Sequence, residues 1–393
     1  MGLSRWIERL KKLSEQADEV VRLEKHNKRV IQRVIKKEFQ RRDIWALRDA
    51  EVQRLAHGRK IWVIKCPAPD TKEKYQWGDY AYCMSLKSVI ERMGYYVVME
   101  CHEDWYEPVQ ADVVLVMRGR HDYHPDRRNE KCRYLMWMVC HPNMVPDEEY
   151  ELYDHIYVDS HLLAEKLQKK VHVPVSSLIV GADVRKFHPA DAAQEFPENE
   201  LENKQAAEAE NARVAEEAQA QHDENPQKYG LVFVGNTRGE KRNSAVWCEK
   251  YHIPLDIWGV GWEKFYPSDT KYLHFHGQMP YEELPELYRN STVILNDHYE
   301  AMRETGMVNN RMIEASACGC PIVSDYSPEY EKIPGKIVFY HGEEDFAAAV
   351  RNALDHAADW RREAEKKFPD LCGSYSMDAC IRRMISDMKS SDV

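Results

Sequence analysis

Residues 309–318 (NNRMIEASAC) place two Asn, an Arg and a Glu in the first turns of a segment that is otherwise small and apolar. Gly319 and Pro321 follow directly, and these residue types stop helices. The pattern predicts a helix over 309–318 that ends at Gly319. The next residues, PIVSD, predict a buried strand.

The polar side chains of this helix have the types that bind a nucleotide diphosphate. A helix N-terminus offers unpaired N–H groups and a positive dipole end to a phosphate, and Arg311 adds a forked donor. Glu314, one turn further along, can accept hydrogen bonds from the two hydroxyls of a ribose. The same spacing also fits an amphipathic helix that pairs Arg311 with Glu314 on its surface. Its inward-facing residues would be Val308, Met312 and Ala315.

Two series of apolar strands that alternate with helices surround this motif. The first series is KIWVIK, YYVVMEC, DVVLVM, YLMWMVC and HIYVDS; the second is LVFVG, LDIWG, YLHFHG, TVILND, PIVSD and KIVFY. Strands that are apolar throughout and alternate with helices predict parallel sheets covered on both faces. Ligands bind such sheets at the carboxyl ends of the strands, so two facing sheets would enclose a small-molecule cleft.

The predicted organisation is α/β, with two domains of similar size and three further segments. Between the domains lies a segment of Ala, Glu, Gln, Asn and Asp that has almost no large apolar residue and cannot form a core. The predicted segments are an N-terminal helical arm (1–58), a first α/β domain (59–189), an acidic Ala-rich linker or insertion (190–228), a second α/β domain (229–358) and a C-terminal helical tail (359–393).

The N-terminal arm carries an apolar stripe at three- and four-residue steps along 3–55, which is typical of an amphipathic helix. Residues 1–60 hold 17 Lys and Arg against 9 Asp and Glu. Two interpretations follow. The arm packs on its own body or on a second copy of the chain, or its basic face meets anionic lipid as a peripheral membrane contact.

Composition excludes several classes of protein. The chain has 393 residues and a net charge of −11, and its acidic body argues against a nucleic-acid partner. Ten Cys without a CxxC pair predict free thiols in a reducing compartment. The longest apolar run, Tyr134–Cys140, is too short to span a bilayer, and the N-terminus lacks a signal peptide. We expect a cytoplasmic protein, with peripheral contact at the inner membrane face as the alternative.

The stretch GMVNNRMIEASACGCPIVSD (306–325) resembles the donor-binding motif of GT-B glycosyltransferases, whose helix reads Glu-Ala-x-Ala-x-Gly-x-Pro-Val. It looks more closely like the spore-maturation-type branch, in which NDH on the preceding strand, NNR at the helix start and ACG-P recur together. YGLVFVGNTRGEKR and WGDYAYCMSLKSVIERMGYYV are similar to the openings of the two domains in that branch. The resemblance runs in order from residue 60 to about 356. It implies two Rossmann-like domains that face each other across a cleft (GT-B).

The resemblance implies that the second domain binds a nucleotide-sugar co-substrate, with no other cofactor and no metal ion. Positive side chains and helix N-termini must then neutralise the diphosphate. Arg238, Lys241 and Arg242 form a basic turn after the strand LVFVG. This turn could bind the diphosphate, or it could simply be exposed to solvent. The expected donor-binding residues are Arg238, Lys241, Arg242, Asn296, Asp297, Asn309, Asn310, Arg311 and Glu314.

One departure from the family pattern concerns the transferred sugar. Many retaining GT-B enzymes carry a pair of Glu residues eight apart, and the second of these matches Glu314. Gly306 stands where the first is expected, and Glu304 is out of register. The resemblance therefore implies a donor site but supplies no matching contact to the sugar.

The expected acceptor side lies in the first domain. Asp79 follows Gly78 at the start of a predicted helix, as a catalytic residue or only as a helix cap. His141 follows the strand YLMWMVC and precedes a Pro, as a catalytic base or as a structural turn residue. Asp104 is its rival as a catalytic residue. Acceptor contacts are expected from Gly78 and from two aromatic residues that could instead belong to the core, Trp77 and Trp105.

Three functions fit these features. The first is a glycosyltransferase that moves a sugar from a nucleotide-sugar to a glycan or other acceptor, in surface polysaccharide or glycan synthesis. The second is a nucleotide-sugar epimerase or hydrolase on the same fold, which would need a cluster of acid and base residues that the sequence does not display. The third is a non-catalytic sugar-binding scaffold, which Gly306 favours. The sequence favours the transferase.

Overall fold

The computed structural model describes residues 46–106, 109–125, 127, 129–195, 229–237, 239–266 and 269–390. The predicted arm up to residue 45, the predicted insertion from 196 to 228, and Arg238 lie outside these residues. The chain divides into two compact units, Met1–Arg59 with Tyr106–Gln110, and Lys60–Trp105 with Ala111–Val393. In the first unit, residues 46–56 are helical, and Asp49 Oδ1 accepts a hydrogen bond from the N–H of Gln110 at 2.8 Å.

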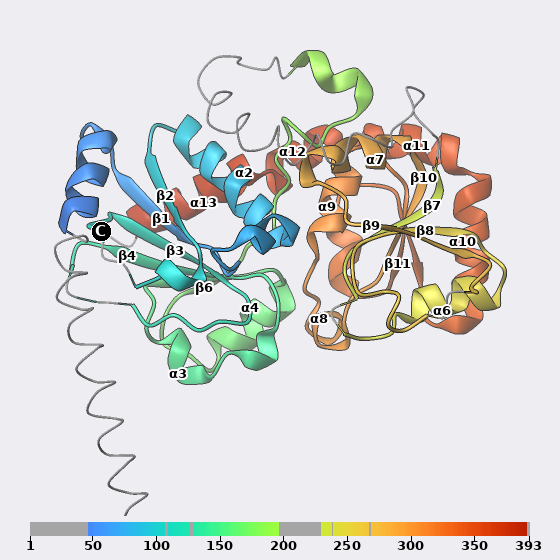
Figure 1. The fold of residues 1–393 in the computed structure, drawn as a ribbon, viewed down its shortest axis with the longest axis horizontal. Helices are drawn as coiled ribbons and strands as arrows, with labels where there is room; N and C mark the ends of the chain where they lie inside the picture. Colours follow the sequence, from blue (N-terminus) through green and yellow to red (C-terminus); the bar gives the residue numbers. More distant parts are fainter. Residues whose placement is uncertain are drawn as a thin grey trace, which may run out of the picture. The chain divides into compact units, whose positions relative to one another are not determined.

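The second unit contains two parallel sheets, as predicted. The first has the strand order β2-β1-β3-β4-β5-β6. Its strands are β1 (Ile61–Lys65), β2 (Tyr96–Glu100), β3 (Val113–Arg118), β4 (Arg133–Met138), β5 (His155–Val158) and β6 (Val175–Ser177). Helices cover it (Figure 1): α2 (Gly78–Arg92), α3 (Asp147–Tyr150) and α4 (His161–Gln168), with 3-10 turns η1 (Lys72–Gln76), η2 (His102–Asp104), η3 (Pro142–Met144) and η4 (Ala190–Glu195). All residues of β1 and β3 are buried, which explains why these strands show no polar alternation.

The second sheet repeats this architecture with the order β12-β11-β10-β7-β8-β9. Its strands are β7 (Tyr229–Val234), β8 (Leu255–Trp258), β9 (Leu273–Gly277), β10 (Ser291–Asn296), β11 (Ile322–Asp325) and β12 (Ile337–Tyr340). Its helices are α6 (Asn243–Lys250), α7 (Leu284–Asn290), α8 (Glu300–Thr305), α9 (Asn310–Ala317), α10 (Glu343–Asp355) and α11 (Ala357–Glu365), with 3-10 turns η6 (Tyr281–Glu283) and η7 (Pro328–Lys332). The motif helix predicted over 309–318 is α9.

The predicted C-terminal tail is not one element. After α11 the chain forms α12 (Phe368–Tyr375) and α13 (Met377–Ser390), and α13 packs against α2 of the first sheet (Figure 1). Ala182 fixes the crossing, because its N–H donates to Tyr375 O and its carbonyl accepts from Met377 N–H, both at 2.9 Å. Gly181 makes this approach possible, since a Cβ there would lie 2.5 Å from the backbone carbon of Ser376.

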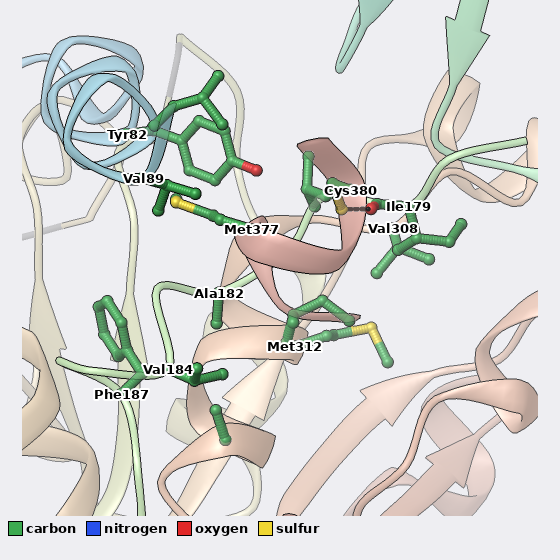
Figure 2. Packing of buried hydrophobic residues seen from close by; sticks show 14 of the residues in the cluster. Tyr82, Val89, Ile179, Ala182, Val184, Phe187, Val308, Met312, Met377 and Cys380 are labelled. Carbon is green, nitrogen blue, oxygen red and sulfur yellow. Dashed lines mark hydrogen bonds between the residues drawn. The ribbon is translucent and has the colours of Figure 1, made fainter. Parts of the chain in front are cut away.

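One apolar core runs through the region where α13 crosses. Figure 2 shows Met377 near Tyr82 and Val89 of α2, while the Cys380 thiol donates to Ile179 O at 3.4 Å. Met312 of α9 belongs to the same buried cluster, so side chains from both sheets share it. The ten Cys all lie among the described residues and form no disulfide, as predicted. Within the described part of the chain, no helix combines the length and apolar character needed to cross a bilayer.

Candidate active site

A cavity of about 250 Å³ opens at the carboxyl ends of strands from both sheets. On the first side it is lined by the start of α2 and by residues that follow β4. On the second side it is lined by residues that follow β7 and β10, and by the first turns of α9. This position, shared between the two sheets, is the cleft that the sequence predicted.

The N-terminus of α9 presents hydrogen-bond donors at this cavity. Asn309 is the cap residue, and its Oδ1 accepts the N–H of Met312 at 3.2 Å. Its Nδ2 donates to Asp297 O at 3.3 Å, which ties the helix start to the end of β10. Asn309 and Asn310 both line the cavity. The first N–H groups of a helix have no partner within it, so they are available to an anion.

Arg311 is fixed in place by the second sheet. Its Nε donates to Val234 O, its Nη1 donates to Asn296 Oδ1 at 2.8 Å, and its guanidinium carbon lies 4.1 Å from the centroid of the Phe233 ring. Burial lowers its pKa, but an arginine keeps its charge at neutral pH. A Cβ on Gly235 would collide with Nη2 of Arg311. Asn296 is fully buried and does not line the cavity, so it positions Arg311 instead.

Glu314 lies one turn further along α9 and is 3% exposed. The Tyr281 hydroxyl donates to its Oε1 at 2.8 Å. Burial raises the pKa of Glu314 to about 7. No ion pair links it to Arg311 in the described structure; Glu314 is buried, Arg311 is partly buried, and both line the cavity. The alternative of an amphipathic helix with a surface Arg–Glu pair is therefore wrong.

A second guanidinium borders the cavity beside β10. Arg242 pairs with Asp297 Oδ1 at 3.1 Å, and its guanidinium carbon lies 3.7 Å from the centroid of the Tyr299 ring. Asp297 Oδ2 accepts from the Ser244 hydroxyl at 2.6 Å. The Nε of Arg242 is buried without a hydrogen-bond partner among the described residues. An unsatisfied buried donor beside a cavity is a group that an anionic ligand can satisfy.

His298 and Tyr281 line the cavity but were not among the predicted site residues. His298 Nδ1 lies 2.7 Å from Asp325 Oδ1, its backbone N–H donates to Asp325 Oδ2 at 3.0 Å, and its ring stacks on another aromatic side chain. Because His298 directly follows the predicted site residue Asp297, the sequence could have identified it as a site residue. Tyr281 lies 33 residues before Glu314, and no local pattern connects the two.

The first sheet contributes the start of α2 to the cavity. Trp77 is the cap residue of this helix and has no side-chain capping bond, while Gly78 and Asp79 occupy its first turn. All three line the cavity. Asp79 is therefore not the N-cap, and its side chain forms no hydrogen bond or ion pair with any described residue. A Cβ on Gly78 would meet no atom within 4 Å, so packing does not require glycine there.

Other predicted residues do not line the cavity. Trp105 is 1% exposed and its Nε1 donates to Cys66 O at 2.8 Å, so its ring belongs to the core and offers no face to an acceptor. His141 has a φ of 53° and precedes η3, which matches its alternative interpretation as a turn residue. Asp104 lies in η2, and Lys241 is exposed.

Gly306 is explained by the packing of the turn between α8 and α9. Its φ is +69°, and a Cβ there would lie 2.6 Å from Glu329 Cγ and 3.3 Å from Ser160 Oγ. The Ser160 hydroxyl also donates to Thr305 O at 2.6 Å, so the residues after β5 press against this turn. A side chain at position 306 would be strained by the positive φ and would displace Glu329, so backbone conformation and packing both favour glycine there.

The charges of the cavity are distributed unevenly. Arg242 and Arg311 both come from the second sheet, and the carboxylates are Asp79, Asp297 and Glu314. The described residues contain no group of three His, Cys, Asp or Glu side chains that could hold a metal ion. Independence from metal ions remains a prediction.

Comparisons with known proteins agree with this architecture. Residues 242–385 match the family model described as glycosyl transferase-like. No curated protein sequence matches the chain. Among solved structures, a sucrose-phosphate synthase from Thermosynechococcus elongatus is similar with a TM-score of 0.58 and 13% identity, over 84% of this chain and 99% of that one.

Two further solved structures hold UDP with glucose, or UDP-glucose. HepE from Anabaena, in complex with UDP and glucose, has a TM-score of 0.53 and 8% identity over 84% of this chain and 100% of its own. An alpha-glucosyltransferase in complex with UDP-glucose and DNA containing an abasic site has a TM-score of 0.53 and 10% identity over 84% and 99%. The fold is the GT-B fold. The predicted GT-B fold is thus confirmed, and the family match, which includes α9, agrees with the predicted glycosyltransferase.

Proposed function

We propose that the chain transfers a sugar from a nucleotide-sugar donor to a hydroxyl group of an acceptor. One observation carries this proposal: Arg242, Arg311 and the N-terminus of α9 meet at one cavity, with the buried Glu314 one turn further along the helix. The two guanidinium groups and the helix N–H groups bind the diphosphate. The Glu314 carboxylate accepts hydrogen bonds from the ribose hydroxyls.

In the transfer, the acceptor oxygen bonds to the anomeric carbon of the donor. The bond from that carbon to the diphosphate breaks, and its electron pair leaves with the nucleotide. Arg242 and Arg311 stabilise the negative charge that grows on the diphosphate. Asp79 receives the acceptor proton, because it lines the cavity whereas Asp104 and His141 do not.

The donor that we propose is a UDP-sugar. This follows from the two structural neighbours that hold UDP with glucose, or UDP-glucose. Because one of these neighbours also holds DNA, the absence of a nucleic-acid partner stays a prediction. A role in surface polysaccharide synthesis, a cytoplasmic location and assembly through the N-terminal arm are likewise predictions. A non-catalytic sugar-binding scaffold stays the alternative, because position 306 lacks the first Glu of the family pattern.

Thermal unfolding with UDP-, GDP-, dTDP- and CMP-sugars tests the donor site, since a ligand that binds the folded state raises the melting temperature. We expect a shift with a UDP-sugar and release of UDP on incubation. Arg311→Lys keeps the charge but loses the fork, so donor affinity should fall about tenfold or more. Arg185→Lys, on an exposed side chain outside the cavity, is the matched control. If no nucleotide-sugar shifts the melting temperature, the proposed function is wrong.

A further inference from the structure

The segment that follows β10 contacts the Arg242 guanidinium in two ways. Asp297 Oδ1 lies 3.1 Å from Arg242 Nη1, and the centroid of the Tyr299 ring lies 3.7 Å from the guanidinium carbon. Arg242, Asp297 and Tyr299 all line the cavity. The carboxylate therefore approaches one nitrogen of the guanidinium, whereas the ring lies against its carbon centre.

The carboxylate by itself does not set the orientation of the guanidinium. Asp297 Oδ2 accepts from the Ser244 hydroxyl at 2.6 Å, and Oδ1 has no hydrogen-bond partner among the described residues. The ion pair with Arg242 thus lacks the two parallel hydrogen bonds that fix a guanidinium on a carboxylate. An aromatic face packed on a guanidinium does restrict it, because the cation stays over the ring.

The Tyr299 ring is held at both of its ends. Its hydroxyl donates to Thr237 O, in the turn after β7, at 3.2 Å. Its backbone follows His298, whose N–H donates to Asp325 Oδ2 at 3.0 Å and whose Nδ1 lies 2.7 Å from Asp325 Oδ1. The ring therefore spans two paired strands, from the end of β10 to the turn after β7. Arg242, the cap residue of α6, follows that turn in the sequence.

We infer that Tyr299 is a positioning residue of the donor site, whose ring holds the Arg242 guanidinium at the diphosphate. This inference rests on the proposed function and adds a residue to it. Without the ring, the guanidinium can turn toward Asp297 and form a forked pair with it. Such a pair would neutralise Arg242 and weaken its attraction for the diphosphate. Tyr299 thus acts through Arg242 and not by its own contact with the reacting atoms.

The test is calorimetric titration of the whole chain with UDP and with uridine. UDP carries the charge that the leaving group acquires, and uridine lacks the diphosphate. Tyr299→Leu should weaken the binding of UDP about tenfold or more, the effect of a lost charge-assisted hydrogen bond. Its affinity for uridine should not change. Tyr299→Phe keeps the aromatic face and should recover most of the affinity for UDP.

A double substitution separates positioning from general support of the fold. In the Arg242→Ala background, Tyr299→Leu should cause no further loss of UDP affinity, because effects that act through one group are not additive. The matched control is Tyr251→Leu, outside the cavity. The Tyr251 hydroxyl donates to Glu343 Oε1 at 3.1 Å, and Lys250 Nζ lies 5.5 Å from the centroid of its ring. This control should change neither affinity.

Retained uridine binding shows that Tyr299→Leu is folded, and Tyr299→Met replaces it if the Leu variant does not fold. An equal loss of affinity for UDP and uridine would mean that Tyr299 only supports the fold. That result overturns the inference, and so does a Phe variant no better than the Leu variant, or a full further loss in the Arg242→Ala background; the donor site stands in each case. If the wild type does not bind UDP, the proposed UDP-sugar donor is wrong and the inference falls with it.

Discussion

Replacing Glu314 by Gln should stabilise the ligand-free protein and weaken its binding of the donor. Burial raises the pKa of Glu314 from the usual 4.5 to about 7. At about 1.4 kcal/mol per pH unit, this difference corresponds to about 3 kcal/mol in the free energy of unfolding. The Tyr281 hydroxyl can still donate to the amide oxygen of Gln, so the substitution removes the charge and keeps the contact.

The folded protein binds the Glu314 proton more tightly than the unfolded chain does. The folded protein keeps Glu314 protonated up to about pH 7, whereas the unfolded chain releases this proton near pH 4.5. The stability of the ligand-free wild type therefore falls as the pH rises through this window. Glu314→Gln has no proton to release. The free energy of unfolding of the variant, relative to that of the wild type, should therefore increase by about 3 kcal/mol between pH 4.5 and pH 8. Urea unfolding measures this difference.

Donor binding should change in the other direction. A hydrogen bond to a charged group contributes about 1.5–3 kcal/mol, so Glu314→Gln should bind the UDP-sugar about tenfold or more weakly in calorimetric titration at pH 8. Wild-type affinity should rise as the pH increases through about 7, and that of the variant should not follow. Glu304→Gln, exposed on α8, is the matched control. A stability difference that does not vary with pH would refute the raised pKa, and an unchanged affinity would refute the contact with ribose.

Three further predictions concern Arg242 and two glycines at which a side chain would collide with neighbouring atoms, Gly235 and Gly181. Arg242→Ala should lower the rate of nucleotide release at saturating donor about a hundredfold or more, with Arg242→Lys recovering part of it; near-normal turnover of a folded Ala variant would exclude this role. Gly235→Ala should displace the guanidinium of Arg311 and weaken donor binding about tenfold or more, whereas Gly230→Ala, with open space around it, should leave affinity unchanged in the same titration. Gly181→Ala should push α13 away from the first sheet and lower the melting temperature by several degrees, about 4 °C or more; an unchanged melting temperature would contradict the crowding at that position.

The sequence by itself determined the class of fold and the residue types of the donor site. Apolar strands that alternate with helices require sheets covered on both faces, and the structure has two such sheets. The helix that starts at Asn309 was predicted because capping and stopping residues act locally. Its polar residues could be assigned to a site for the same reason: the spacing of Arg311 and Glu314 on one helix is fixed by helix geometry alone.

Only the tertiary structure decided which of the candidate residues reach the cavity. Trp105 and His141 carry suitable chemistry in the sequence, but one is packed into the core and the other forms a turn. Tyr281 bonds to Glu314 across 33 residues, a distance along the chain at which no local pattern operates. The pKa of Glu314 depends on burial by elements remote in sequence, and so does the return of α13 to the first sheet. Spacing along the chain fixes neighbours within a helix or strand, whereas burial and long-range contacts arise only when the packed elements exclude water together.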